Sequence, residues 1–276
     1  MVNEFDVKNP DKEELKKIYN DRTRFNSHFS SLGGYKNPYD KYRMHAVIEA
    51  VRSCEPRTIL DNGCGACLIG SELARRGYKV TGSDISWELL KQVPRNKNLN
   101  LVAGDSEELP FKDSSFDCVV CSEVLEHLKD HKKAAKEIAR VMRRGGLAVI
   151  TIPNMFCYDS LEGSFGIISK SIATINFLIR ILRMKPVYQY GHNTHLNKML
   201  PSQWKALLES AGLKVDKERA VFLSPYLPER MQFLERAVYE LPGLFHLKTW
   251  VDDWVSGVWP FKYLGISHLF VCRKTI

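Results

Sequence analysis

Two pairs of cysteines have the C-x-x-C spacing of zinc sites and redox centres: Cys64 with Cys67, and Cys118 with Cys121. The second pair falls in an apolar run that predicts a strand, where positions three apart point to opposite faces. The first pair lies at a predicted strand-to-helix turn, but it lacks the context of a thioredoxin motif and further ligands at short spacing. We therefore expect free thiols and no metal ion at either pair.

Two glycines in the same turn, Gly63 and Gly65, offer a different chemistry, because a glycine loop after a strand can wrap a nucleotide. A dinucleotide-binding loop would have a third glycine at position 68, where this sequence has Leu68. NAD and FAD are therefore disfavoured as ligands.

Carboxylates follow four of the apolar runs, and all four would meet at one edge of a parallel sheet. They are Asp61, Asp84, Asp105 and Glu123. Such a site attracts a ligand with an amine and a positive centre, and it repels a pyrophosphate. One such carboxylate could simply be a helix N-cap, as Asp84 could be, but four in succession indicate a binding site.

The elements that position these residues alternate between short apolar runs and helical patterns. We expect strands at residues 57–60, 78–83, 99–104, 116–121 and 147–152, and helices at residues 70–77, 86–93 and 132–142. The segment 105–115, between the third and fourth strands, contains no clear helix. The alternation predicts a parallel sheet with right-handed crossovers, and hence a doubly wound α/β fold.

Three stretches together resemble the successive motifs of the class I S-adenosylmethionine-dependent methyltransferases. They are TILDNGCGACLIGSELARRGYKVTGSDIS, GDSEELPFKDSSFDCVVCSEVLEHLKD and EIARVMRRGGLAVITIPN; PSQWKALLESAGLKV, at residues 201–215, continues the resemblance more loosely. The resemblance implies a Rossmann-like, doubly wound α/β fold with a seven-stranded, mostly parallel sheet and helices on both faces. It also implies S-adenosyl-L-methionine as the cofactor.

The resemblance further implies three groups of cofactor-binding residues. One group wraps the methionine part of the cofactor with its backbone: Asp61, Gly63 and Gly65. A second group binds the ribose hydroxyls and the adenine: Asp84, Ile85, Asp105 and Ser106. A third group lines the methionine end: Ser122 and Glu123. The third small residue of the first motif is usually glycine in this family, and Cys67 stands in its place.

Candidates for the chemical step and for contact with the methyl acceptor lie around these motifs. His127 follows the fourth strand in SEVLEHL, and the E-x-L-E-H pattern resembles that of quinone O-methyltransferases. It is the candidate general base, with a purely structural histidine at the turn as the alternative. Four residues are candidates for acceptor contact: Tyr19, Tyr42, His192 and His195.

The chain divides into six segments: an N-terminal helical lid (1–54), the cofactor-binding core (55–154), a helical acceptor-cap insertion (155–200), a continuation of the core (201–222), an aromatic-rich helical insertion (223–262) and the last core strand (263–276). The first insertion carries an apolar helical stripe, which predicts a packed cap or an in-plane membrane contact. The second holds Trp250, Trp254 and Trp259, which we expect to fill a core between cap helices. An apolar acceptor pocket or a membrane-interface belt is the alternative.

Composition sets limits on the partners. The chain has 276 residues and a formal net charge of +8, and much of the excess lies in a helical pattern near residues 129–143. We expect a solvated helix face there rather than a nucleic-acid surface, because no nucleic-acid-binding motif accompanies it. The first residues lack the apolar core of a signal peptide, so we expect a cytoplasmic location, with peripheral membrane contact of the cap as an alternative.

Together these features predict an enzyme that methylates a small, substantially apolar acceptor, lipid-like, isoprenoid or phenolic, at oxygen or carbon. Two other functions stay open. One is a nucleic-acid methyltransferase that uses the basic helix, and the other is a donor-binding module without turnover. The oligomeric state is not indicated by the sequence.

Overall fold

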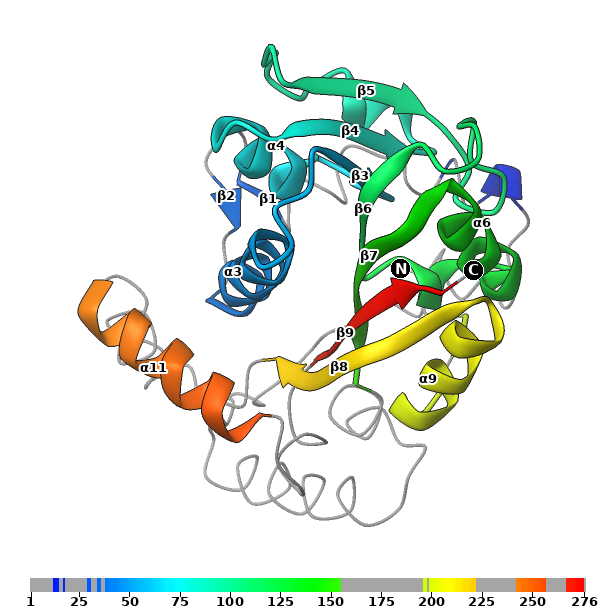
Figure 1. Ribbon diagram of the computed structural model, residues 1–276. Coiled ribbons are helices and arrows are strands. Elements are labelled where there is room, and N and C mark those ends of the chain that lie inside the picture. Colours follow the sequence, from blue (N-terminus) through cyan, green and yellow to red (C-terminus); the bar gives the residue numbers. More distant parts are fainter. Residues whose placement is uncertain are drawn as a thin grey trace, which may run out of the picture.

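A seven-stranded sheet forms the centre of the protein (Figure 1). The computed structural model describes residues 12–14, 17, 29–30, 34–35, 38–154, 196–197, 199–221, 242–256 and 267–275. In spatial order the strands are β5 (Leu99–Ala103), β4 (Lys79–Asp84), β3 (Thr58–Asn62), β6 (Phe116–Ser122), β7 (Met142–Pro153), β9 (Ser267–Lys274) and β8 (Leu213–Val221). A separate antiparallel pair is formed by β1 (Phe29–Ser30) and β2 (Gly34–Tyr35).

The sheet is mostly parallel, as the sequence predicts. β3 pairs in parallel with β4 and β6, β4 with β5, and β6 with β7. β9 runs antiparallel to both of its neighbours, β7 and β8. The strand order changes direction at β3, so loops after β3 and β6 leave in opposite directions and open a crevice between them. The carboxylates that follow the strands therefore lie at the edge where this fold binds ligands.

Helices cover the sheet on both faces. The structure has α3 (Pro38–Arg52), α4 (Leu68–Arg75), α5 (Trp87–Leu90), the 3-10 turn η1 (Leu125–His127), α6 (His131–Val141), α9 (Pro201–Ser210) and α11 (Pro242–Val255). The segment between β5 and β6 contains no helix, as predicted. α5 is shorter than predicted, because Ser86 caps its start and the chain turns after Leu90. β7 begins earlier than predicted, because Met142 already pairs with Phe116.

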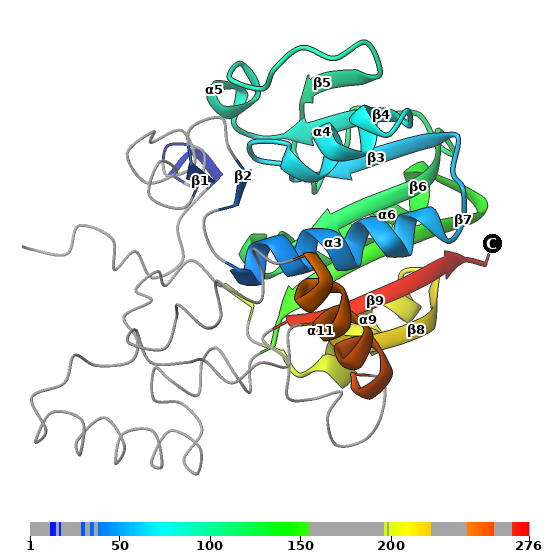
Figure 2. The same ribbon diagram turned by 90° about the vertical axis from the view of Figure 1, so that its left-hand side faces the viewer.

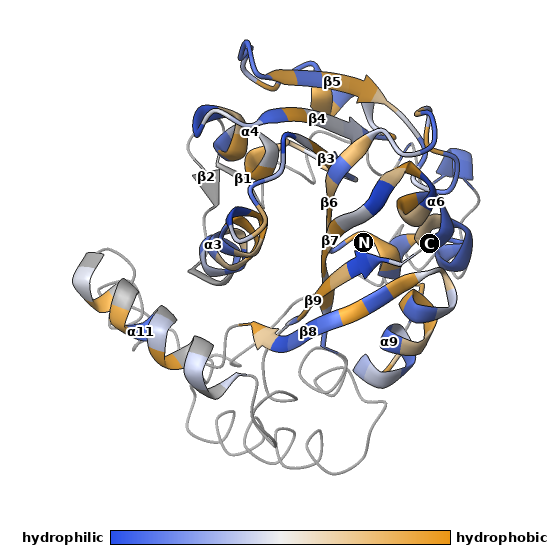
Figure 3. Cartoon of the chain, in the orientation of Figure 1, coloured by the Kyte–Doolittle hydropathy of each residue, from blue (hydrophilic) through white to orange (hydrophobic). Residues whose placement is uncertain are grey.

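Two apolar cores result from the alternation of side chains along the strands. Cys118 and Val120 of β6 belong to the core under α3 and α4, whereas Val119 and Cys121 belong to the core under α6 and α9. The prediction that Cys118 and Cys121 face opposite sides of a strand is therefore confirmed. Figure 3 shows apolar residues along β6 and β9, with polar and apolar residues mixed on the covering helices.

Helices α3 and α11 lie on the face that is turned toward the viewer in Figure 2, together with α4. α3, which the sequence groups with the N-terminal lid, packs on the sheet and buries Ala46, Val47 and Val51 in the core. α11 lies on the same side, and its Lys248 ammonium is 5.0 Å from the centroid of the Tyr42 ring on α3. In the described part of the chain, no helix is both long enough and apolar enough to cross a membrane.

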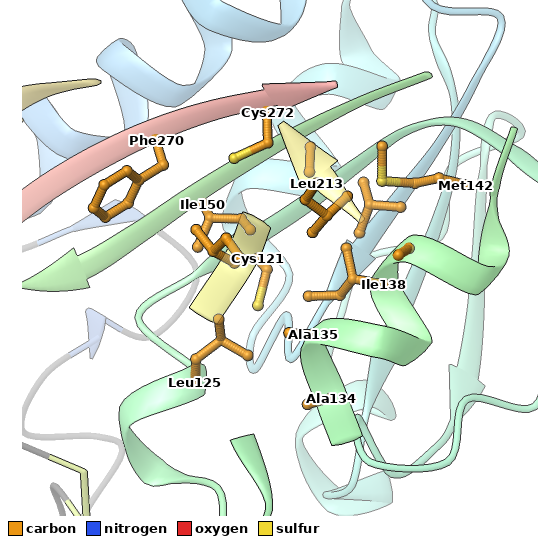
Figure 4. Close-up of a cluster of buried hydrophobic side chains, with 14 of the residues drawn as sticks. Cys121, Leu125, Ala134, Ala135, Ile138, Met142, Ile150, Leu213, Phe270 and Cys272 are labelled. Atoms are coloured by element: carbon orange, nitrogen blue, oxygen red, sulfur yellow. The ribbon is translucent and has the colours of Figure 1, made fainter. Parts of the chain in front are cut away.

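The core under α6 is drawn in Figure 4, where side chains from α6, β6, β7, β8 and β9 meet. Ile138 stands at the centre of the α6 contribution and is completely buried. We expect Ile138→Ala to lower the free energy of unfolding by about 2–5 kcal/mol, because it leaves a cavity in a close-packed core. Urea unfolding followed by circular dichroism measures this change.

Lys136→Ala, on the exposed side of the same helix, is the matched control and should change stability by no more than about 0.5 kcal/mol. If both variants lowered the free energy of unfolding equally, the loss could not be attributed to the buried Ile138 side chain. The described packing of this core would then be wrong.

Candidate functional site

The turn between β3 and α4 is built from left-handed backbone. Gly63 has a φ of 67°, Gly65 of 53° and Cys67 of 52°, in the region that favours glycine. A Cβ atom on Gly63 would lie 2.5 Å from Val124 Cγ2, so no side chain fits there. The amides of Gly63 and Cys64 donate to the Ser83 carbonyl at 2.8 and 3.0 Å, which attaches the turn to the end of β4.

Asp84, at the end of β4, holds the middle of this turn. Its Oδ2 accepts a hydrogen bond from the Gly65 amide at 2.7 Å, and its Oδ1 accepts one from the Ser86 amide at 2.8 Å. Burial raises the pKa of the Asp84 carboxyl above its usual value. A Cβ atom on Gly65 would meet nothing within 4 Å, so the backbone beside the Asp84 carboxylate faces open space. The turn therefore forms a cradle with an acidic wall.

Asp61, at the end of β3, turns its side chain away from this open space. Asp61 Oδ2 accepts a hydrogen bond from the Gly70 amide at 2.8 Å, within the first turn of α4. Burial raises the pKa of Asp61 to about 7. The carboxyl fixes α4 against the strand, and only the Asp61 backbone remains a candidate for contact with a ligand in the open space beside Gly65.

The end of β5 is joined both to β3 and to the N-terminal segment. Ser106 Oγ donates to Asn62 Oδ1 at 2.9 Å. Asp105 Oδ2 lies 2.7 Å from Lys12 Nζ, which also lies 2.7 Å from Glu107 Oε2. No sequence motif indicated Lys12, which belongs to the predicted lid segment. Through this contact it pairs with Asp105, a proposed adenine-binding residue. Ile85, the other adenine candidate, is partly exposed beside Asp84.

Ser122, the last residue of β6, and Glu123, which follows it, both contact the positively charged side chain of Arg43. No sequence motif indicated this arginine. Arg43 Nη1, from α3, donates to Ser122 Oγ at 3.3 Å and lies 3.8 Å from Glu123 Oε1. Its Nη2 lies 2.8 Å from Asp40 Oδ1. Glu123 also accepts a hydrogen bond from Ser267 Oγ at 3.0 Å, and burial raises its pKa. The only hint in the sequence was the place of Arg43 beside Tyr42, a proposed acceptor contact.

His127 ends the 3-10 turn that follows β6, next to a buried acid. Glu126 is 2% exposed, its carboxyl oxygens have no hydrogen-bond partner, and burial raises its pKa well above the usual value. Its Oε1 lies 3.6 Å from His127 Nε2. Glu126 is the second acid of the E-x-L-E-H pattern, and that pattern was the signal that could have identified it.

The proposed acceptor contacts are described only in part. Tyr42 is 1% exposed and lies beneath Lys248. Tyr19, His192 and His195 lie outside the described residues. The expectation that the tryptophans of the second insertion fill a core is wrong for Trp250 and Trp254, which are 66% and 74% exposed. Both lie on the exposed side of α11, whereas Lys248 points toward α3.

A pocket of about 380 Å³ lies at the opposite end of the parallel strands. Four arginines are among the residues that line it: Arg57, Arg143, Arg144 and Arg273. Parallel sheets bind their ligands at the carboxyl ends of the strands, and this pocket is at the amino ends. It is therefore not part of the candidate site.

Comparisons with known proteins agree with this geometry. Residues 60–150 match the model of a family described as a methyltransferase domain. A ubiquinone biosynthesis O-methyltransferase from Coxiella burnetii (strain Dugway 5J108-111) is 29% identical over 222 residues, which cover 75% of this chain and 84% of the relative. An enzyme of the same name from Alkalilimnicola ehrlichii is 37% identical over 119 residues, 41% of this chain and 48% of the relative.

Among solved structures, the [4+2]-cyclase SpnF has the same fold, with a TM-score of 0.61, 18% sequence identity and 97% of each chain covered. The glycine turn and Asp84 lie at the carboxyl edge of the sheet, and both belong to the matched domain. The chain carries a methyltransferase domain and is an S-adenosylmethionine-dependent methyltransferase, and S-adenosylmethionine is its cofactor. The open space beside Gly65 fits this cofactor, because the acidic wall faces a ligand with a positive sulfur and an amine.

We expect Asp84→Ala to weaken cofactor binding by about 1–3 kcal/mol, because it removes charge-assisted hydrogen bonds. Calorimetric titration with S-adenosylhomocysteine measures the affinity. Asp113→Ala is the matched control, because it removes an exposed carboxylate elsewhere in the domain. Unchanged affinity in a folded Asp84→Ala protein would remove Asp84 from the site.

Proposed function

We propose that this methyltransferase transfers a methyl group to a hydroxyl oxygen of a small, largely apolar, phenolic or quinone-type acceptor. The observation that carries the proposal is the similarity to relatives named for ubiquinone biosynthesis and O-methyl transfer, which extends over three quarters of the chain. The E-x-L-E-H segment lies within that region, at the carboxyl end of β6.

The cofactor would be held by the edge formed after β3, β4, β5 and β6. Gly63 and Gly65 contribute backbone that can approach the ligand closely, and Asp84 contributes the carboxylate for the ribose hydroxyls. Asp105 and Ser106 would address the adenine. S-adenosylmethionine supplies a methyl group on a positively charged sulfur, which is already activated, so the chain mainly has to align the acceptor.

His127 is the proposed base. A hydroxyl acceptor must lose its proton as the new oxygen–carbon bond forms, and an imidazole can accept that proton near neutral pH. Glu126 is the proposed positioning residue, because its buried carboxyl lies 3.6 Å from His127 Nε2. The Glu126 carboxyl has no hydrogen-bond partner, so a contact with His127 would satisfy a group that is costly to leave buried alone.

An exposed apolar row on α11 supports an apolar acceptor. Five side chains form it and are 40–74% exposed: Leu244, Leu247, Trp250, Val251 and Trp254. Lys248 of the same helix lies over Tyr42, so the helix that carries the row, though not the row itself, contacts a proposed acceptor residue. Contact of this row with a membrane surface stays a prediction.

The basic helix gives less support to a nucleic-acid acceptor, because much of its charge is already paired. Arg140 lies 2.7 Å from both Glu137 and Asp113. Lys133 lies 3.5 Å from Glu108 Oε2. Nucleic-acid binding needs basic groups that are available to phosphates, and it would depend steeply on salt.

The proposed function is tested with methyl-labelled cofactor and cell extract, followed by partition of the label between organic, aqueous and precipitated fractions. We expect enzyme-dependent label in the organic phase, with little effect of added salt, and much less label with the Asp84→Ala protein. Label in the precipitated fraction that nuclease or protease releases would contradict the proposal, and so would the absence of any transfer.

We expect His127→Ala to lower kcat by about 10²–10⁴-fold, because the acceptor proton then has no positioned base. The affinity for S-adenosylhomocysteine should stay within about twofold of the parent, because His127 makes no proposed cofactor contact. Steady-state kinetics over a range of pH values, with calorimetry on the same samples, separates the two effects. Unchanged turnover would make His127 a structural residue.

A further inference from the structure

Three potential metal-ligating side chains meet behind the glycine turn. The carboxyl of Asp61 and the thiols of Cys64 and Cys67 each offer one ligand atom, and these atoms all lie within 4.8 Å of one another. Cys67 Sγ lies 3.8 Å from Asp61 Oδ2. A tetrahedral zinc ion holds sulfur and oxygen ligands roughly 3.5–3.8 Å apart, so small side-chain movements would complete the set.

Two glycines provide the space for these thiols. A Cβ atom on Gly70 would lie 2.7 Å from Cys67 Sγ. A Cβ atom on Gly82 would lie 2.7 Å from Cys67 Sγ and 3.1 Å from Cys64 Sγ. These glycines come from α4 and β4, so two separate elements leave room for sulfur at the same place.

Cys67 holds its thiol there at a conformational cost. Its φ of 52° is in the region that favours glycine, and it forms no side-chain cap at the start of α4. Glycine would relax this position but would remove the sulfur. Cys67 is completely buried whereas Cys64 is partly exposed, so Cys64 is the member of the cluster nearest to the protein surface.

The cluster also lacks a cation. Within the described residues, no lysine or arginine forms an ion pair with Asp61. Burial favours the neutral forms of these groups without a cation, whereas their deprotonated forms together are the ligand set of a soft divalent ion. A bound divalent cation would offset that charge.

We propose that Asp61, Cys64 and Cys67 bind a thiophilic divalent metal ion of the zinc class, with water as the fourth ligand. Binding releases one proton from each thiol, so affinity should rise with pH. Cys64 lies between the two glycines of the proposed cofactor cradle, so the metal should pull on the same turn and oppose cofactor binding. This second effect rests on the proposed cofactor site, whereas metal binding itself does not.

The test is a titration of the full, reduced chain with cobalt(II), a spectroscopic substitute for zinc. We expect a sulfur-to-cobalt charge-transfer band that saturates at a single equivalent and disappears when zinc is added. Cys67→Gly should lose the band and keep the fold, because glycine is favoured at this φ. Cys54→Ser, which changes an exposed thiol at the other end of the sheet, should keep the band.

The effect on the cofactor is measured by calorimetry with S-adenosylhomocysteine, with and without zinc. We expect zinc to lower the affinity by about tenfold or more in the parent and by less than about twofold in Cys67→Gly. Absence of the band in the parent, an equal band in Cys67→Gly, or a disulfide between Cys64 and Cys67 in its place would overturn the metal site. If metal binds but the metal-free chain does not bind S-adenosylhomocysteine, the proposed cofactor site fails and the metal site stands.

Discussion

The attachment of the β3–α4 turn to the end of β4 is the constraint on which the candidate site depends. Gly63 and Cys64 donate to the Ser83 carbonyl, and Gly65 donates to the Asp84 carboxylate. These bonds are possible only because the turn passes through left-handed backbone, which positions its amides toward the neighbouring strand. Since Asp84 is fixed by the same bonds, the acidic wall and the open backbone beside Gly65 form one rigid unit before any ligand binds.

Electrostatics is the second requirement. The four acids at this edge of the sheet would repel one another if all were charged and solvent were excluded. The structure reduces this repulsion in two ways. Lys12 pairs with Asp105, and Arg43 lies beside Glu123, so cations from outside the motifs balance two of the acids. Burial raises the pKa of Asp61 to about 7, which favours a neutral carboxyl there. Asp84 is also buried with a raised pKa, but its carboxyl accepts two backbone hydrogen bonds beside the open space of the turn.

The sequence predicted the parallel core well, because strand periodicity and glycine turns are local properties. The opposite orientation of Cys118 and Cys121 followed from the strand pattern alone. Arg43 and Lys12 could not be predicted, because α3 and the N-terminal segment reach the site through tertiary packing. The exposure of Trp250 and Trp254 also depends on which face of α11 meets α3. The meeting of Asp61 with Cys64 and Cys67 was missed because the third ligand comes from the strand rather than from a second cysteine motif.

In the proposed function, the two halves of the reaction would depend on different parts of the chain. The proposed cofactor side consists of strand ends and tight turns, where small changes in the backbone disturb several hydrogen bonds together. The proposed acceptor side consists of η1 and of the parts of α3 and α11 near Tyr42. The same fold occurs in a protein named as a [4+2]-cyclase, so the fold does not determine which bond is made. In the proposed function, the choice of acceptor would therefore come from the environment of His127 and Glu126 and from the side chains around Tyr42.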